Sequence, residues 1–257
     1  IKRIIKVNQS PIGKTPRSTV VSYLGIFDEI RMLFSKTSMA KELKLSPTMF
    51  SMNIKGGRCE SCQGTGLQKI ELNYLPSAYI TCPECNGRRY NEKIISVTYR
   101  NKTILDVLET PIAEIIEIFN DTKKVYSVLR CMVELGLGYL TLGQMSMSLS
   151  GGEAQRIKLA KALGTLSRGK SLYILDEPTS GLNEIDIDRF IKVLFSLQNK
   201  GETILIIEHN IEFIAKVADY IIDFGVYGGD LGGKIVAQGK PRDVFAKKDS
   251  SLCGLDG

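Results

Sequence analysis

The stretch from Leu172 to Glu177 most strongly limits what this chain can fold into. It reads Leu-Tyr-Ile-Leu-Asp-Glu, a short apolar run that ends in two adjacent carboxylates, Asp176 and Glu177. A run of this kind is typical of a buried strand. A carboxylate pair at the end of a core strand is costly unless it holds a cation or handles a proton. The stretch therefore predicts a core β-strand with a chemical site at its carboxyl end.

A second motif, Leu149–Ile157, lies shortly before this strand and reads Leu-Ser-Gly-Gly-Glu-Ala-Gln-Arg-Ile. Ser150 suits a helix N-cap, and Glu153 three residues later completes a capping box. A helix is therefore predicted to begin at Gly151 and Gly152. Its first turn presents free backbone N–H groups and a positive dipole end, which suit a phosphate. A phosphate grip combined with the two carboxylates indicates nucleotide hydrolysis.

The order of these motifs resembles that of the ABC-type ATPases. Their signature motif resembles Leu149–Arg156, their Walker B motif and D-loop resemble Leu175–Leu182, and their switch histidine resembles His209 after Ile-Ile-Glu. The resemblance implies an α/β fold, in which an ABC-type ATPase lobe with a mainly parallel sheet carries an inserted helical signature domain.

The resemblance also implies roles for individual residues. Asp176 would hold the Mg²⁺ that bridges the β- and γ-phosphates of ATP, and Glu177 would be the general base for the attacking water. His209, the one histidine in the sequence, would contact the γ-phosphate. Asn183 stands where many members have an aspartate in the D-loop. The signature residues Ser150, Gly151 and Gly152 would grip the γ-phosphate of a nucleotide bound by the opposite ATPase half.

The N-terminal segment is expected to be a strand followed by the Q-loop, with Gln9 contacting magnesium and the attacking water. The nearby Gly13-Lys14-Thr15 is not a Walker A loop, because the pattern requires a glycine five positions before Gly13 and Asn8 stands there. Pro16 also disfavours a helix beginning at Thr15. We therefore expect that this chain lacks its own phosphate loop, is inactive as an ATPase by itself, and begins just after the loop as a fragment or receives it from another polypeptide.

Composition places the chain among ordinary globular proteins. It is 43% apolar and 24% charged, with a formal net charge of +6. No apolar run approaches the ~18 residues that a membrane helix requires, and no basic-then-apolar leader is present. We expect a cytoplasmic protein without a membrane partner, and the basic balance is compatible with nucleic acid as a partner.

Four of the six cysteines form two Cys-x-x-Cys pairs separated by 19 residues. The pairs are Cys59 with Cys62 and Cys82 with Cys85. Spacing of this kind predicts a tetrahedral structural zinc site, since four thiolates close around one ion and leave no position open for substrate. A redox dithiol and plain core cysteines are the alternatives. The sequence Cys-Glu-Ser-Cys-Gln-Gly-Thr-Gly also resembles the zinc repeats of the DnaJ chaperones.

Between the cysteine pairs, residues 68–75 and 79–81 alternate polar and apolar side chains, which predicts a hairpin carried on the zinc. Such a protrusion could follow a nucleic-acid backbone and stack on exposed bases; a solvated basic surface is the alternative. The candidate DNA-binding residues around it are Lys14, Arg17, Arg88 and Arg89.

With the cysteine module placed between Q-loop and signature, the resemblance to the UvrA family spans nearly the whole chain. It rests on Asn8–Ser18, on the cysteine module and on Gly136–Gln144. It implies the C-terminal ATPase half of a UvrA-type protein. The expected domains are the start of the ATPase lobe at 1–22, the inserted helical signature domain at 23–148 with the zinc module at 55–95, and the signature helix with the rest of the lobe at 149–257.

The implied function is ATP-dependent recognition of DNA damage in nucleotide excision repair, within the bacterial excinuclease and its SOS response. The implied partners are damaged double-stranded DNA, a second copy in a full-length homodimer, and a UvrB-like protein that contacts an N-terminal region absent here. Two alternatives stay open. One is a UvrA-like ATPase for drug self-resistance, and the other is a zinc-bearing DNA or protein interaction fragment without turnover.

Overall fold

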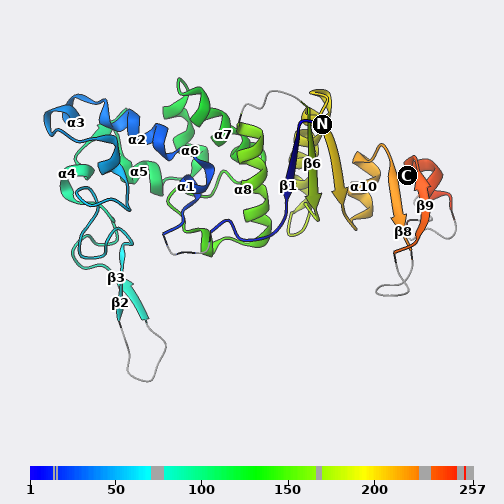
Figure 1. Cartoon of the computed structure of the whole chain (residues 1–257), viewed down its shortest axis with the longest axis horizontal. Helices are drawn as coiled ribbons and strands as arrows, with labels where there is room; N and C mark the ends of the chain where they lie inside the picture. The colour runs from blue at the N-terminus through cyan, green and yellow to red at the C-terminus, as the bar shows by residue number, and fades with distance from the viewer. Residues whose placement is uncertain are drawn as a thin grey trace. The chain divides into compact units, whose positions relative to one another are not determined.

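The computed structural model describes residues 1–13, 15, 17–70, 78–165, 170–225, 233–247 and 252 (Figure 1). The chain divides into two compact units. Residues 1–6 and 170–257 form the first, here called the sheet unit, and residues 7–169 form the second, here called the helical unit. Among the described helices, none is long and apolar enough to cross a membrane.

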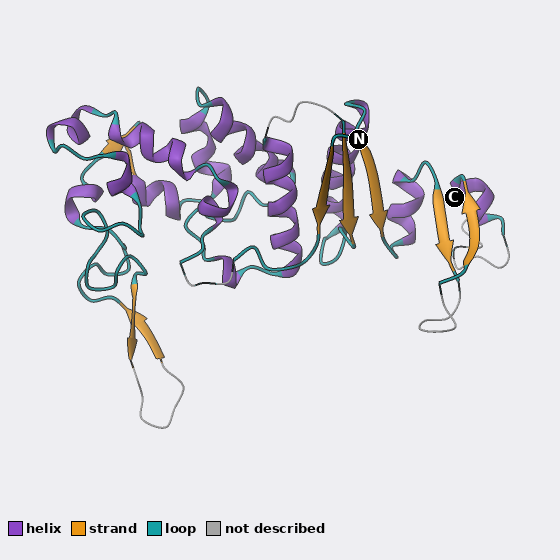
Figure 2. Cartoon of the chain, viewed as in Figure 1, coloured by secondary structure: helices purple, strands orange, loops and turns teal. Residues whose placement is uncertain are grey.

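The sheet unit is built on a three-stranded sheet in the order β1-β6-β7 (Figure 2). A separate antiparallel pair, β8 and β9, and three helices complete it. Its elements are β1 (Arg3–Val7), β6 (Ser171–Asp176), α9 (Glu184–Asn199), β7 (Thr203–Ile207), α10 (Ile211–Val217), β8 (Ile221–Phe224), β9 (Ile235–Gly239) and α11 (Pro241–Phe245).

The pairing of β6 with β7 is parallel and sets the geometry of this unit. Leu172 lies opposite Thr203, and Asp176 lies opposite Ile207. The alternation along β6 buries Tyr173 and other side chains on one face of the strand. On the helices, the rings of Phe190 in α9 and Phe213 in α10 stack with centroids 6.0 Å apart.

The helical unit consists mainly of short helices, with two small hairpins. Its elements are α1 (Val20–Leu24), α2 (Phe27–Ser35), α3 (Ser38–Glu42), η1 (Pro47–Phe50), β2 (Leu67–Ile70), β3 (Ala78–Thr81), α4 (Glu92–Ile95), β4 (Thr98–Tyr99), β5 (Lys102–Thr103), α5 (Ile104–Glu109), α6 (Ile112–Ile115), η2 (Ile116–Phe119), α7 (Lys123–Glu134), η3 (Ser146–Ser148) and α8 (Gly151–Gly164). The three η elements are 3₁₀ helices.

Close packing of α7 against α8 fixes one side of the helical unit. A Cβ atom at Gly164, the last residue of α8, would lie 2.5 Å from the Cα of Val128 in α7. Only glycine allows this approach, because no real Cβ contact is that short. Elsewhere in the unit an aromatic cluster forms the core, with Phe34 5.8 Å from Phe50 and 5.9 Å from Tyr99 between ring centroids.

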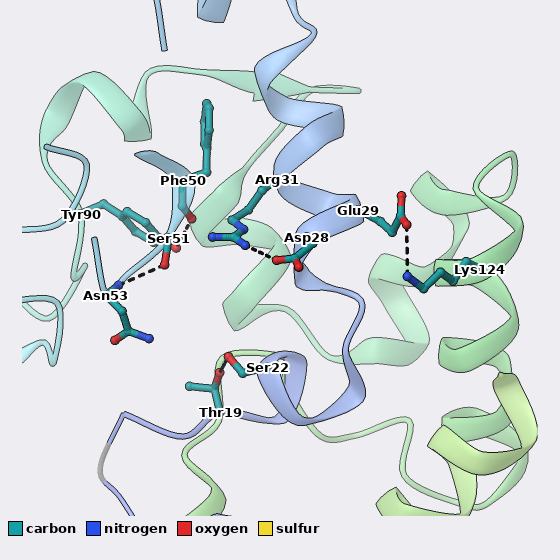
Figure 3. Close-up of polar contacts among 10 residues, drawn as sticks. All are labelled: Thr19, Ser22, Asp28, Glu29, Arg31, Phe50, Ser51, Asn53, Tyr90 and Lys124. Carbon is teal, nitrogen blue, oxygen red and sulfur yellow. Dashed lines mark hydrogen bonds and ion pairs between the residues drawn. The ribbon is translucent and has the colours of Figure 1, made fainter. Parts of the chain in front are cut away.

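Figure 3 shows polar contacts within α2, between α2 and α7, and at the buried Tyr90. Arg31 pairs with Asp28 on the same helix, and Glu29 accepts a hydrogen bond of 3.1 Å from Lys124 at the start of α7. The buried Tyr90 donates its hydroxyl to the carbonyl oxygen of Phe50 at 2.9 Å. Burial raises the pKa of Tyr90, so the hydroxyl remains a donor at neutral pH.

The predicted hairpin between the cysteine pairs is present as β2 and β3, which pair antiparallel with Leu67 opposite Thr81. Residues 71–77 lie outside the described residues. The strands expected at the N-terminus and in Leu172–Glu177 are confirmed as β1 and β6, and the helix predicted to begin at Gly151 and Gly152 is confirmed as α8. The helical unit ends just before Lys170, because α8 packs on α7 and α1 within it.

Replacing Tyr90 by Phe tests the contact that links η1 to the buried ring. The change leaves the Phe50 carbonyl without this donor, so we expect Tyr90→Phe to lower the free energy of unfolding by about 1–2 kcal/mol. Tyr79→Phe is the matched control, since Tyr79 is 61% exposed and should change stability by less than about 0.5 kcal/mol. Equal urea-unfolding midpoints and slopes for the two variants would contradict the assigned role of Tyr90.

Candidate functional site

The carboxyl end of β6 carries the two carboxylates that the sequence singled out. Asp176 is the last residue of the strand and is exposed. The next residue, Glu177, continues the contact with β7 by donating its N–H to the carbonyl oxygen of Ile207 at 2.8 Å. Its φ of 46° lies in the left-handed region, which is uncommon for a residue with a side chain and occurs often at functional sites.

The imidazole of His209 lies beside Glu177, as the parallel pairing of β6 and β7 requires. Its Nδ1 atom is 4.0 Å from Oε1 of Glu177 and 3.5 Å from Oε1 of Glu208. The His209 side chain is 78% exposed, whereas that of Glu208 is 2% exposed. The end of the sheet thus combines exposed carboxylates with an accessible imidazole, a set that can bind a cation, move a proton and donate to a phosphate.

Asn183 has a structural role as the N-cap of α9. Its side-chain oxygen accepts from the N–H of Asp186 at 2.9 Å, and its amide donates to the Asp186 carboxylate at 3.0 Å. Asparagine is among the preferred N-cap residues. A D-loop aspartate at this position could cap the helix equally well, which accounts for the substitution without loss of the helix start.

The start of α8 has the predicted capping box. Ser150 Oγ accepts from the N–H of Glu153 at 3.2 Å, and the Glu153 carboxylate accepts from the N–H of Ser150 at 2.7 Å. Tyr139 also donates its hydroxyl to this carboxylate at 2.5 Å. Gly151 and Gly152 occupy the first turn, where backbone N–H groups have no acceptor within the helix. A helix start of this kind can attract an anion.

Three hydrogen bonds outweigh the desolvation of Glu153. Burial alone raises the pKa of this carboxyl, but the hydroxyl of Tyr139 and the backbone and side chain of Ser150 lower it below its ordinary value. The carboxylate is thus held ionised at the start of α8, and it fixes the position of Ser150.

Gln9 lies against the start of α8 within the helical unit. A Cβ atom placed on Gly151 would be 3.5 Å from both Cβ and Oε1 of Gln9. Lys158, two turns along α8, holds the same segment: its Nζ lies 3.0 and 2.6 Å from the backbone and side-chain oxygens of Asn8, and 2.7 and 2.6 Å from those of Ser10. The segment that carries Gln9 and the signature helix are therefore one connected piece.

The predicted nucleotide-site residues fall into two groups, one in each unit. Asp176, Glu177 and His209 belong to the sheet unit, whereas Gln9, Ser150, Gly151 and Gly152 belong to the helical unit.

The four cysteines of the two Cys-x-x-Cys pairs meet in a buried cluster in the helical unit. The sulfur atoms of Cys59, Cys62, Cys82 and Cys85 all lie within 4.8 Å of one another. Cys62 Sγ also accepts from the N–H of Gly66 at 3.3 Å. A set of four converging sulfurs with a backbone N–H donor suits a tetrahedral, thiolate-bound metal ion such as zinc.

The pKa values of the Cys82 and Cys85 thiols shift in opposite directions. Burial raises the pKa of Cys82, but backbone N–H groups of Cys85 and Glu84 outweigh it and hold the pKa at about 7. Burial and the neighbouring thiols raise the pKa of Cys85 to about 12. Four thiolates in one buried cluster repel one another, so their full ionisation requires a bound cation.

The candidate DNA-binding residues have protein partners where the structure describes them. Arg17 donates to Oε1 of Gln63 at 3.2 Å, and Arg88 pairs with Glu92 at 2.6 Å. Arg89 donates to the carbonyl oxygen of Gly143 at 3.0 Å. Lys14 lies outside the described residues. Arg89 therefore contributes to the packing of the helical unit, and any role in DNA binding remains a prediction.

Metal analysis tests the cysteine cluster. We expect the purified chain to contain about one zinc per polypeptide, and Cys85→Ser to lose it, because a fourth thiolate is needed to close the site. Cys131→Ser is the matched control, since Cys131 lies outside the cluster and should leave the zinc content unchanged. Purified chain without zinc, or full retention by Cys85→Ser, would contradict the assignment.

The pH dependence of stability tests the capping box. The folded-state pKa of Glu153 is lowered, so its stabilisation is present above the unfolded value of about 4.3 and is lost as pH falls through the folded pKa. Glu153→Ala should cost about 1 kcal/mol at pH 7. The difference from the unmodified chain should shrink below about pH 4 in urea unfolding. A difference that stays constant across this range would show that the ionised carboxylate contributes nothing.

Three comparisons relate the chain to known proteins. A family model described as "ABC transporter" matches residues 28–180, which is more than half of the chain. UvrABC system protein A of Staphylococcus aureus (strain COL) is 50% identical over 250 residues, which are 97% of this chain and 26% of that protein. The protein of the same name from Halalkalibacterium halodurans is 49% identical over the same share of each chain.

The crystal structure of UvrA2 from Deinococcus radiodurans has the same fold. It superposes with a TM-score of 0.90 at 45% sequence identity and covers 98% of this chain and 31% of that one. The chain thus spans about a quarter of the length of the curated relatives it matches. It has the ABC ATPase fold with a parallel sheet. The chain belongs to the ABC transporter family, and over nearly all of its length its sequence and fold resemble those of UvrA proteins.

Proposed function

We propose that this chain is the C-terminal ATPase half of a UvrA-type protein, which uses ATP to recognise damaged DNA in nucleotide excision repair. The observation that carries the proposal is the end of the β6–β7 pair, where the Glu177 carboxylate lies 4.0 Å from the His209 imidazole beside Asp176. The similarity to UvrABC system protein A supports the repair role. Neither the self-resistance role nor the fragment without turnover has a specific observation in its favour.

The chemistry proposed for this end of the sheet is hydrolysis of the γ-phosphate. Asp176 would hold Mg²⁺, which neutralises phosphate charge when bound. Glu177 orients the attacking water and takes its proton. His209, with Nδ1 directed at two carboxylates, presents its other ring nitrogen to the terminal phosphate.

One face of the β6–β7 pair supports completion of the site by further sequence. Leu205 is 50% and Ile207 55% exposed, and both share the face of their register partners Ile174 and Asp176. Parallel sheets are normally covered on both faces. We propose that the rest of an ATPase lobe, including its phosphate loop, covers this face in a protein of the relatives' length. On that view the chain by itself does not turn over ATP.

The signature residues serve a second nucleotide in this proposal. Ser150, Gly151 and Gly152 would bind the γ-phosphate of ATP held by the opposite ATPase half, because their N–H groups and helix dipole attract an anion. The connection from Gln9 to α8 through Lys158 joins this contact to the Q-loop. The helical unit then acts as the signature domain inserted into the ATPase lobe.

The cysteine cluster would hold a structural zinc through Cys59, Cys62, Cys82 and Cys85. With four thiolate ligands it supplies folding energy to the module and no catalytic position. The β2–β3 hairpin, which lies between the two cysteine pairs in sequence, projects away from the helices of its unit (Figure 2), with Tyr79 61% exposed. Lys69 lies opposite Tyr79 in the hairpin, and an exposed tyrosine paired with a lysine suits stacking on bases and contact with phosphates. We propose damaged double-stranded DNA as the partner of this chain. The full-length protein would be a cytoplasmic homodimer and would bind a UvrB-like protein as a further partner.

Glu177→Gln tests the hydrolytic role in a protein of the relatives' length. The amide cannot take a proton, so steady-state ATP hydrolysis should fall by about 10²- to 10⁴-fold, while binding of a fluorescent ATP analogue should persist. Glu184→Gln, an exposed change in the first turn of α9, is the matched control and should leave turnover unchanged. Normal turnover in Glu177→Gln would remove Glu177 from the base role.

A further inference from the structure

Glu208 is a buried carboxylate that directly follows β7 and precedes His209. None of the sequence motifs described above assigns a role to it. Its side chain is 2% exposed, whereas the side chain of His209 next to it is 78% exposed. A carboxylate removed from water in this way is costly unless hydrogen bonds compensate its charge. The contacts of Glu208 therefore require an explanation of their own.

The two oxygens of Glu208 hold two different loops. Oε2 accepts from the backbone N–H of Thr179 at 3.2 Å and from its hydroxyl at 2.8 Å. Oε1 accepts from the N–H groups of His209 at 2.9 Å and Asn210 at 3.2 Å. The carboxylate thus joins the loop that follows β6 to the loop that follows β7.

Both loops carry residues of the proposed hydrolytic site. Thr179 lies two residues after Glu177, and a 3.2 Å hydrogen bond from Ser180 N–H to the Glu177 carbonyl closes the turn between them. On the other side, Nδ1 of His209 faces Oε1 of Glu208 at 3.5 Å. Movement of Glu208 would therefore displace the general base and the histidine together.

We propose that Glu208 is the positioning residue that sets Glu177 and His209 relative to each other. The proposal rests on the proposed ATP hydrolysis for its functional consequence, but its structural basis is independent of it. Glu208 touches neither nucleotide nor water in this role; it acts through the backbone of Thr179 and His209.

Only a glutamate at this position can satisfy both loops. Glutamine offers one accepting oxygen and an NH₂ group that meets backbone N–H donors, so one loop loses its acceptor. Aspartate is one methylene shorter and cannot span the same distance from the same backbone. The side-chain charge also strengthens all four hydrogen bonds.

Amide hydrogen exchange of the 257-residue chain tests the structural part without ATP. In Glu208→Gln, exchange should accelerate by about tenfold or more either at the N–H of Thr179 or at the N–H groups of His209 and Asn210, because the amide leaves one of the two loops without its acceptor. The N–H groups within the β6–β7 ladder should keep their protection. Unchanged exchange at all three loop amides would overturn the proposal.

Glu202→Gln is the matched control, because Glu202 accepts from the backbone N–H of Ser171 at the opposite end of the same strand pair. It removes a carboxylate contact between β6 and β7 and should leave the three loop amides unchanged. If Glu202→Gln accelerates exchange at these amides as strongly as Glu208→Gln does, general loosening of the sheet is the cause and the proposal fails.

Thr179→Val and Thr179→Ser test the hydroxyl arm with smaller changes. Valine keeps the Thr179 N–H and the side-chain shape but removes the donor to Oε2, whereas serine keeps the donor. In a protein of the relatives' length, Thr179→Val should lower kcat by about 10- to 100-fold, the range for lost supporting contacts. KM should change little, and Thr179→Ser should retain most of kcat.

These results distinguish the positioning role of Glu208 from the proposed ATP hydrolysis. Faster loop exchange in Glu208→Gln with unchanged kcat in a turnover-competent protein would overturn the positioning role. Loss of kcat in Glu208→Gln and Thr179→Val, with recovery in Thr179→Ser, supports it. Absence of ATP turnover in the unmodified protein would instead refute the proposed function, while the exchange measurement would still decide whether Glu208 holds both loops.

Discussion

The parallel register of β6 and β7 is the constraint on which the proposed site depends. It places Asp176 opposite Ile207, so the residues that follow each strand emerge side by side. The Glu177 N–H extends the pairing by one hydrogen bond to Ile207. A shift of one residue would turn Asp176 to the opposite face of the sheet and separate Glu177 from His209. The register of the β6–β7 pair therefore decides whether the residues of the proposed site lie together.

In the helical unit, a charged side chain holds two separate segments together. The Lys158 ammonium binds oxygens of Asn8 and Ser10, and burial lowers its pKa. It fixes the segment containing Gln9 against the start of α8, while Glu153 fixes Ser150 at the same helix start. The parts of the unit proposed to meet nucleotide are thus connected by ionic hydrogen bonds rather than by apolar packing alone.

Local patterns in the sequence were sufficient for much of this structure. The capping box of Ser150 and Glu153 and the apolar run that forms β6 each involve neighbouring residues and predicted α8 and β6, and the spacing of the four cysteines predicted their cluster. The roles of Glu208 and Lys158 were missed because each side chain also meets a partner distant in sequence: Glu208 accepts from Thr179, 29 positions earlier, and Lys158 Nζ meets an oxygen 150 positions away. Nor could the sequence show that α8 belongs with α7, which depends on the close approach at Gly164.

The central claim is that one chain supplies the hydrolytic end of one ATP site and the signature helix of another. A structure of the protein at the length of its UvrA relatives, with Mg²⁺ and a non-hydrolysable ATP analogue, tests it most directly. The account predicts Mg²⁺ beside Asp176, one terminal phosphate beside Glu177 and His209, and a second terminal phosphate at the N–H groups of Gly151 and Gly152. Nucleotides bound away from both positions would contradict it.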